Sequence, residues 1–132
     1  MGCILKRKLL NKLRWWPTAL VAAAILWLTL APHPVPETQI ELFEGADKVV
    51  HAIMFFALAF ALIFDLWIGK RKVSLITCLY AALAVTAFAA VDEWAQGAMG
   101  LGRTSDLLDF FADCSGILLA LLFASIIFSH RQ

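Results

Sequence analysis

Charged residues are scarce in this chain, at 16% of its 132 residues, whereas hydrophobic residues make up 62%. Soluble globular domains are about one-quarter charged, so this scarcity excludes an ordinary soluble domain. The apolar residues also form runs long enough to cross a bilayer, which takes about 20 residues. The composition therefore predicts an all-α integral membrane protein, with almost nothing left over for a soluble domain.

Cysteine is also scarce, and the three cysteines give no disulfide framework and no CxxC motif. No Cys/His spacing is typical of a zinc or iron–sulfur site. Cys78 and Cys114 fall inside apolar segments, where we expect small buried thiols. The cysteine pattern therefore gives no reason to expect a metal centre or a redox cofactor.

Acidic residues are missing from residues 1–14, a segment that carries five lysines and arginines. Leucines recur there at helical spacing, so the segment is either an amphipathic helix on an anionic membrane surface or a tail that only fixes the topology. The segment is short and adjoins an apolar run. The sequence therefore gives no support for nucleic-acid binding.

Four apolar segments are predicted to be transmembrane helices, with a loop between the last two at residues 92–105. Their expected bounds are 15–31, 48–68, 73–91 and 106–128. The first also resembles a signal peptide, but Pro32 at the cleavage position argues for a retained helix. Asp65 lies one turn from the end of the second segment. We expect its carboxylate to snorkel toward the lysines of the turn at 70–72.

The basic residues predict the orientation. Nine of the eleven lysines and arginines lie in residues 1–14, in the turn at 70–72 and at Arg131, whereas only Lys48 and Arg103 lie on the other side. Basic residues favour the cytoplasmic side of a membrane. We therefore expect four transmembrane helices in the inner (cytoplasmic) membrane, with both termini in the cytoplasm, residues 129–132 among them.

The stretch from Val91 to Gly116 holds five of the ten carboxylates and is flanked by apolar segments. Ionisable groups that enter a membrane-length helix are expensive and mark a functional site. The polar residues from Arg103 to Gly116 follow three- and four-residue steps, which place them on one stripe of a helix. A second group, Asp47 to His51, opens another apolar segment, and we expect the two groups to meet.

Two aspartates of this stripe have different expected roles. Asp106 could cap the last helix, because acids stabilise a helix N-terminus, and this is at least as plausible as a catalytic role. Asp113 would lie about 10 Å deeper along the helix. There it must be protonated, hydrogen-bonded to a neighbour such as His51, or facing a wet cavity.

The first hypothesis is an outward-facing site that binds or processes an anionic lipid or cell-envelope precursor. Arg103, with Lys48, would hold a phosphate or carboxylate, and Gln96 is a further ligand-binding candidate. In a second form of this hypothesis, several of the carboxylates hold a divalent cation such as Mg²⁺. No spacing selects a metal, so we expect no metal ligands and no cofactor.

Catalysis at such a site would centre on His51 as general acid or base, oriented by Asp47 or Glu93. The candidate catalytic residues are His51, Glu93 and Asp109. The supporting residues are Asp47, Asp106 and Asp113.

Three short motifs in this order and spacing are similar to those of the VanZ-like family of small bacterial membrane proteins. They are Asp47-Lys48-x-x-His51, Glu93-x-x-Gln96 and Arg103-x-x-Asp106-x-x-Asp109-x-x-x-Asp113-x-x-Gly116. The resemblance extends over residues from about 15 to 128, and the family usually has Asn where this chain has Asp113. It implies about four helices with polar positions at their outer ends, and a link to the cell envelope and to resistance against glycopeptide antibiotics such as teicoplanin.

The alternative hypothesis is a non-catalytic accessory or structural subunit of a larger membrane complex. The polar network would then hold together helices that have no hydrophobic drive to associate in lipid. Arg103 would be a salt-bridge partner of Asp106 or Asp109. Proton or ion transport is a third hypothesis, which the sequence favours less because, Asp65 apart, no polar residue continues toward the inner face.

Overall fold

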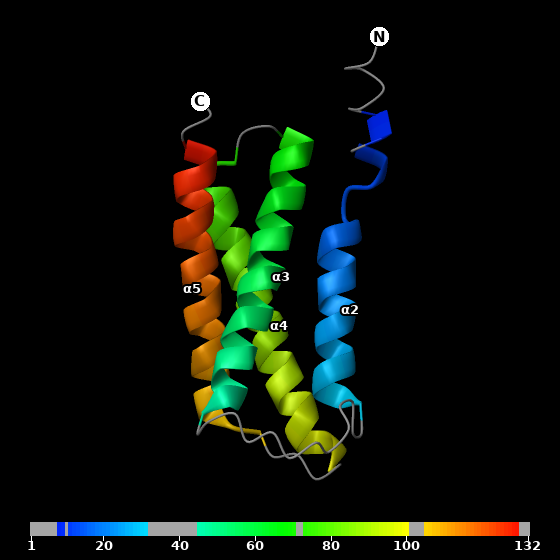
Figure 1. Cartoon of the computed structure of the whole chain (residues 1–132), viewed down its shortest axis with the longest axis vertical. Coiled ribbons are helices and arrows are strands. Elements are labelled where there is room, and N and C mark those ends of the chain that lie inside the picture. Colours follow the sequence, from blue (N-terminus) through cyan, green and yellow to red (C-terminus); the bar gives the residue numbers. More distant parts are fainter. Residues whose placement is uncertain (1–7, 10, 32–44, 71–72, 101–104, 130–132) are drawn as a thin grey trace.

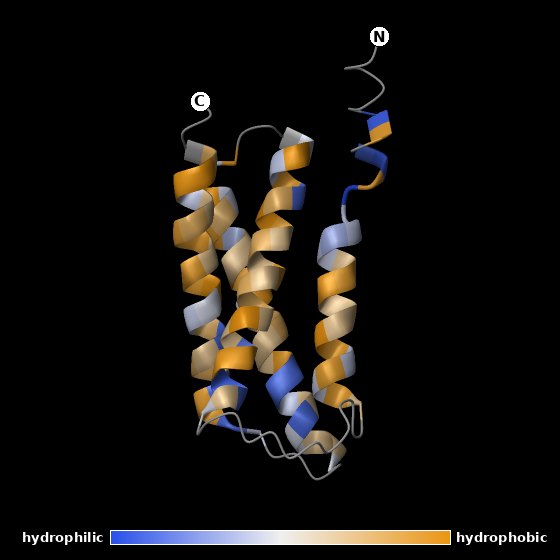
Figure 2. Ribbon diagram, viewed as in Figure 1, coloured by the Kyte–Doolittle hydropathy of each residue, from blue (hydrophilic) through white to orange (hydrophobic). Residues whose placement is uncertain are grey.

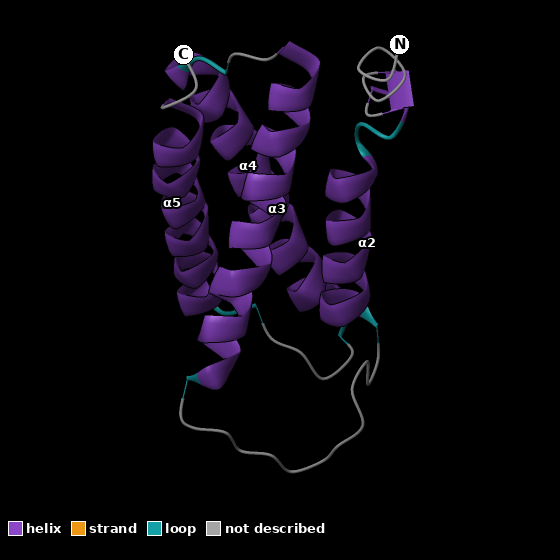
Figure 3. Ribbon diagram, turned by 45° about the horizontal axis from the view of Figure 1, so that its top comes forward, coloured by secondary structure: helices purple, strands orange, loops and turns teal. Residues whose placement is uncertain are grey.

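A computed structural model describes residues 8–9, 11–31, 45–70, 73–100 and 105–129. Within these ranges helix is the only regular structure (Figure 3). The helices are α2 (Trp16–Leu30), α3 (Ala46–Lys70), α4 (Leu75–Met99) and α5 (Leu107–Ser129). They form a bundle in which α2 and α4 run in one direction and α3 and α5 in the other (Figure 1). The expected all-α fold is confirmed.

Three of the helices are long and apolar enough to cross a membrane, namely α3, α4 and α5. The fourth, α2, has 15 residues and would extend about 22 Å. Large apolar side chains stand on the outside of the bundle, such as Leu83 at 65% exposure and Leu122 at 62%. A water-soluble protein rarely exposes so much apolar surface. These features fit a multi-pass membrane protein.

Exposed aromatic residues lie near both ends of the bundle. Trp27 and Trp94 are near the ends of α2 and α4, whereas Trp16 and Tyr80 are near the starts of the same helices, and all four are mostly exposed. Tryptophan and tyrosine are enriched at the two membrane–water interfaces. The spacing of these rings along the bundle therefore also fits a protein that crosses a bilayer.

Helix α3 lies at the centre and packs against α2, α4 and α5, most extensively against α5. Gly116 of α5 allows this closeness, since a Cβ atom there would overlap the backbone carbonyl of Ala52 in α3. Further toward the middle of the bundle, Phe55, Ile117 and Ala120 are fully or nearly fully buried. The glycine that ends the polar stripe of the sequence is thus the point where two helix backbones meet.

Helix α4 continues to Met99, and this corrects the expected end at Val91 and the expected loop at 92–105. The buried face of the helix runs without a break from apolar residues to polar ones, which are Asp92, Glu93 and Gln96. Gly100, in the left-handed conformation at φ 62°, ends the helix. The charged residues after Val91 suggested that the helix ends at the membrane surface. Their side chains are instead buried inside the bundle, and the helix continues through them.

The expectation for Asp65 was also wrong. Its side chain is fully buried, and its Oδ2 accepts hydrogen bonds from the Thr18 backbone N–H at 3.2 Å and from the Thr18 hydroxyl at 2.5 Å. Thr18 lies in the first turn of α2, whose backbone N–H groups have no partner within the helix. Asp65 therefore points inward and caps a neighbouring helix instead of snorkelling toward the lysines.

Candidate functional site

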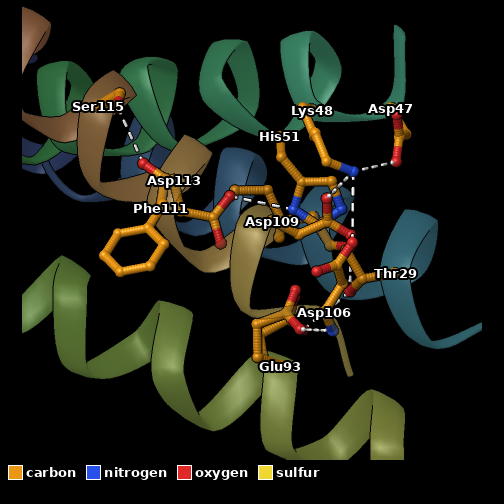
Figure 4. A network of polar contacts seen from close by, with 12 residues as sticks. Thr29, Asp47, Lys48, His51, Glu93, Asp106, Asp109, Phe111, Asp113 and Ser115 are labelled. Atoms are coloured by element: carbon orange, nitrogen blue, oxygen red, sulfur yellow. Dashed lines mark hydrogen bonds and ion pairs between the residues drawn. The ribbon is translucent and has the colours of Figure 1, made fainter. Parts of the chain in front are cut away.

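Polar residues gather at one end of the bundle, where α3 begins, α4 ends and α5 begins (Figure 2). This end is called the polar end below, and the opposite one the far end. The expected meeting of the group from Asp47 to His51 with the later polar stretch is present here (Figure 4). Arg103, the expected anion-binding residue, lies outside the described residues.

His51 pairs with the deepest aspartate of the site. Its Nδ1 lies 3.0 Å from Oδ1 of Asp113, and the two side chains are 12% and 1% exposed. With Asp113 ionised, Nδ1 carries the ring proton and Nε2 is left for another partner. The contact that the sequence suggested for Asp113 is thus present. Asp47, one of the two expected orienting residues, contacts Lys48 instead, and its side chain is 59% exposed.

Lys48 joins α3 to α5 through several carboxylates. Its Nζ lies 3.2 Å from Asp109, 3.3 Å from Asp106 and 2.9 Å from Asp47. These three acids surround the only lysine of the polar end within the described ranges. Lys48 is therefore engaged, and an anionic ligand would have to displace one of its carboxylates.

Glu93 joins the end of α4 to the start of α5. Its Oε2 accepts hydrogen bonds from the Asp106 backbone N–H at 3.1 Å and from the Ser105 hydroxyl at 3.4 Å. Its Oε1 is buried and has no hydrogen-bond partner in the part of the chain that the structure describes. The side chain is only 5% exposed, so one oxygen of a buried carboxylate is held firmly and the other is left open.

Asp106 is the cap that the sequence allowed. Its Oδ1 accepts a hydrogen bond from the Leu108 backbone N–H at 2.9 Å. Its backbone carbonyl accepts from the N–H groups of Asp109 and Phe110. The bond from Leu108 favours the ionised form and is the main reason that the pKa of the Asp106 carboxyl lies below its usual range.

A separate network ties α2 to α4. The Thr29 hydroxyl lies 2.8 Å from Oδ1 of Asp92, and the Gln96 side-chain amide donates to Oδ2 of Asp92 at 3.2 Å. All three side chains are buried. Gln96, which was expected to bind a ligand, thus donates its side-chain hydrogen bond to Asp92 in this structure. Sequence reasoning missed Thr29, whose one signal is a hydroxyl residue near the end of an apolar segment.

No protein-family model, curated protein or solved structure matches this chain.

Three side chains of the polar end converge on one point. His51, Glu93 and Asp109 each offer a nitrogen or oxygen atom, and these atoms lie within 4.8 Å of one another (Figure 4). They come from α3, α4 and α5, so the cluster exists only when the three helices pack together. These are also the three residues that the sequence proposed as catalytic. A convergent imidazole and two carboxylates can transfer a proton, accept hydrogen bonds from a ligand, or bind a cation.

Proposed function

We propose that the chain is a VanZ-like protein of the inner (cytoplasmic) membrane, with four transmembrane helices and both termini in the cytoplasm. The distribution of lysine and arginine supports this topology through the positive-inside rule. The apolar helix α2, which packs against α3 and α4, supports a fourth membrane segment. The polar end then faces the outside.

We further propose that this polar end binds or processes an anionic lipid or cell-envelope precursor. Two buried carboxylate oxygens beside His51 carry the proposal, namely Oε1 of Glu93 and Oδ2 of Asp113, which lack donors among the described residues. A network that only holds helices together satisfies its buried polar groups, because an unsatisfied one is costly. Open acceptors favour a ligand that brings hydroxyl or ammonium donors, as lipid headgroups and sugars do.

The roles of the residues follow from this arrangement. His51, oriented by Asp113, would act as general acid or base through Nε2. Arg103 would hold the phosphate or carboxylate of the ligand, because Lys48 already has three carboxylates. A site of this kind would alter envelope precursors at the outer surface, and lower susceptibility to glycopeptide antibiotics is the matching effect on cells.

Native mass spectrometry of the full chain, purified gently from its own membranes, tests this proposal. We expect a bound phosphate-containing lipid or precursor that is lost from Arg103→Ala. The same ligand should stay on Lys12→Ala, which removes an exposed basic residue at the far end. Circular dichroism of each variant confirms that it is folded. A ligand that remains on folded Arg103→Ala argues against the anion site.

The accessory-subunit alternative has its own support in the Thr29–Asp92–Gln96 network, whose three side chains are buried and join α2 to α4. If it is correct, the same measurement finds a stoichiometric protein partner and no small ligand. Arg103→Ala then fails to fold or loses the partner. That combination would replace the ligand-binding proposal.

A further inference from the structure

We propose that His51, Glu93 and Asp109 form a binding site for one divalent transition-metal ion. Their donor atoms lie within 4.8 Å of one another, from three different helices. Ligands of one ion at about 2.0–2.2 Å lie between roughly 3 and 4 Å apart. Small side-chain adjustments therefore bring the three atoms into the first coordination sphere of an ion.

Each of the three side chains is held by a second partner that leaves one donor atom open. Asp113 occupies Nδ1 of His51, the Asp106 backbone and Ser105 occupy Oε2 of Glu93, and Lys48 occupies Oδ1 of Asp109. Among the described residues, these contacts leave Nε2 of His51, Oε1 of Glu93 and Oδ2 of Asp109 for a ligand. Outer partners of this kind orient the ligands of metal sites, and a carboxylate on the far nitrogen of a histidine is typical.

The open oxygen of Glu93 is a second sign of a cation, beside the short distances between the three donor atoms. Its side chain is 95% buried and extends from α4 toward the two other residues, and Oε1 lacks any hydrogen-bond partner within the described part of the chain (Figure 4). A buried carboxylate oxygen with no donor is costly. Neither His51 nor Asp109 supplies that donor in this structure. An ion between the three residues would satisfy it.

The charge of the polar end points the same way. Around Lys48 and His51 stand the carboxylates of Asp47, Glu93, Asp106, Asp109 and Asp113. Among the described residues, acids thus outnumber basic groups. Like charges packed in a partly buried site repel one another, and a divalent cation would offset that repulsion.

The ligand set selects the kind of ion. One imidazole nitrogen with two carboxylate oxygens suits zinc, manganese or iron, whereas Mg²⁺ and Ca²⁺ prefer oxygen ligands alone. Three protein ligands also leave a coordination position for water or a substrate oxygen. The site is of the open type, and we expect Zn²⁺ to bind more tightly than Mn²⁺.

What the ion does for a ligand rests on the proposed function, since a cation at this point would attract the phosphate of an anionic lipid. With an ion bound, Nε2 of His51 is a metal ligand, and the acid–base role proposed above then applies only to the ion-free protein. The existence of the site does not depend on that function. Ion binding can be measured without any lipid.

The test is titration of the full chain in detergent, stripped with EDTA and then freed of it, with Zn²⁺ or Mn²⁺ alone. We expect one ion per chain by elemental analysis after gel filtration, and Mg²⁺ affinity at least about tenfold lower. Glu93→Gln, which keeps the size of the side chain, should weaken Zn²⁺ binding at least about tenfold. Asp113→Asn should weaken it by about 10- to 100-fold through His51.

Asp65→Asn is the matched control, because it also changes a buried carboxylate to an amide but lies at the far end. It should bind Zn²⁺ like the unchanged protein. Co²⁺ absorption gives a second measurement on variants that stay folded, and the spectrum should change in His51→Ala. No stoichiometric ion in the unchanged protein, or equal affinity in folded Glu93→Gln, overturns the metal site.

The native mass spectrometry described above, repeated in EDTA, separates the two proposals. A lipid that remains bound without an ion, together with failed titrations, would sink the metal site and leave the lipid site standing. An ion that binds at one per chain, with no lipid at all, supports the metal site and removes the proposed lipid function.

Discussion

The two ends of the bundle both bury carboxylates, but within the described part of the chain they leave different side-chain atoms without hydrogen-bond partners. At the far end these are Oδ1 of Asp65, an acceptor, and Nε of Arg14, a donor whose guanidinium lies against Gly69, one turn of α3 from Asp65. At the polar end both are acceptors, on Glu93 and Asp113. A donor and an acceptor can satisfy each other, whereas two carboxylate oxygens need a proton, a cation or a ligand. This contrast favours a structural role for the far end and agrees with the ligand and the ion proposed for the polar end.

Glycine replacements at the two ends should have the most different effects. Gly116→Ala places a Cβ atom on the backbone of Ala52 and forces α3 and α5 apart, so we expect a loss of about 1–3 kcal/mol in unfolding free energy. Gly69→Ala meets only the side chain of Arg14, which can move. Alanine favours helix over glycine by up to about 1 kcal/mol. Thermal unfolding in detergent compares the two, and equal effects would contradict the close contact at Gly116.

Removal of the Asp65 carboxylate tests whether the far end is structural. Asp65→Ala leaves the backbone N–H and the hydroxyl of Thr18 without their acceptor, and we expect a loss of about 1–3 kcal/mol. Asp65→Asn keeps an acceptor oxygen and should lose less. Both variants should keep the ligand and the ion of the polar end. Unfolding curves measure the first effect, and a loss of ligand from a folded variant would show that the ends are coupled.

Neutralising Glu93, whose Oε1 is open, should raise the unfolding free energy instead of lowering it. Glu93→Gln keeps an oxygen for the Asp106 backbone N–H and removes charge from a crowded group of acids. In EDTA we expect a gain of about 0.5–2 kcal/mol, since functional sites are commonly less stable than they could be. With Zn²⁺ present, the unchanged protein should be more stable than the variant. A variant that is less stable in EDTA would make Glu93 a purely structural residue.

The sequence predicted the all-α fold from the length of the apolar segments, and spacing along one helix placed Asp113 on the polar stripe. It offered the contact with His51 as one of three possibilities for Asp113, and the structure has that contact. The sequence misplaced Asp65 and the end of α4, because an acid in an apolar segment can face lipid headgroups or point inward toward a neighbouring helix. Only packing decides between these. The same limit applies to Thr29, whose partner Asp92 lies on a helix distant in sequence. Spacing shows which residues share a face, but not which helix that face meets.

The smallest expected effect concerns Asp106, which caps the N-terminus of α5 at the polar end. Its carboxyl is exposed in part and accepts from the Leu108 N–H, so its pKa in the folded protein lies below the usual value of about 3.9. The bond stabilises the folded state fully above that usual value and is lost as the pH falls through the lower, folded value. Asp106→Ala should therefore lower the unfolding temperature at pH 7 but approach the unchanged protein at the acid end of a pH series. If the difference in unfolding temperature persists at acid pH, the Asp106 side chain stabilises the protein by packing. The charges of the polar end would then contribute less to its difference from the far end than we infer here.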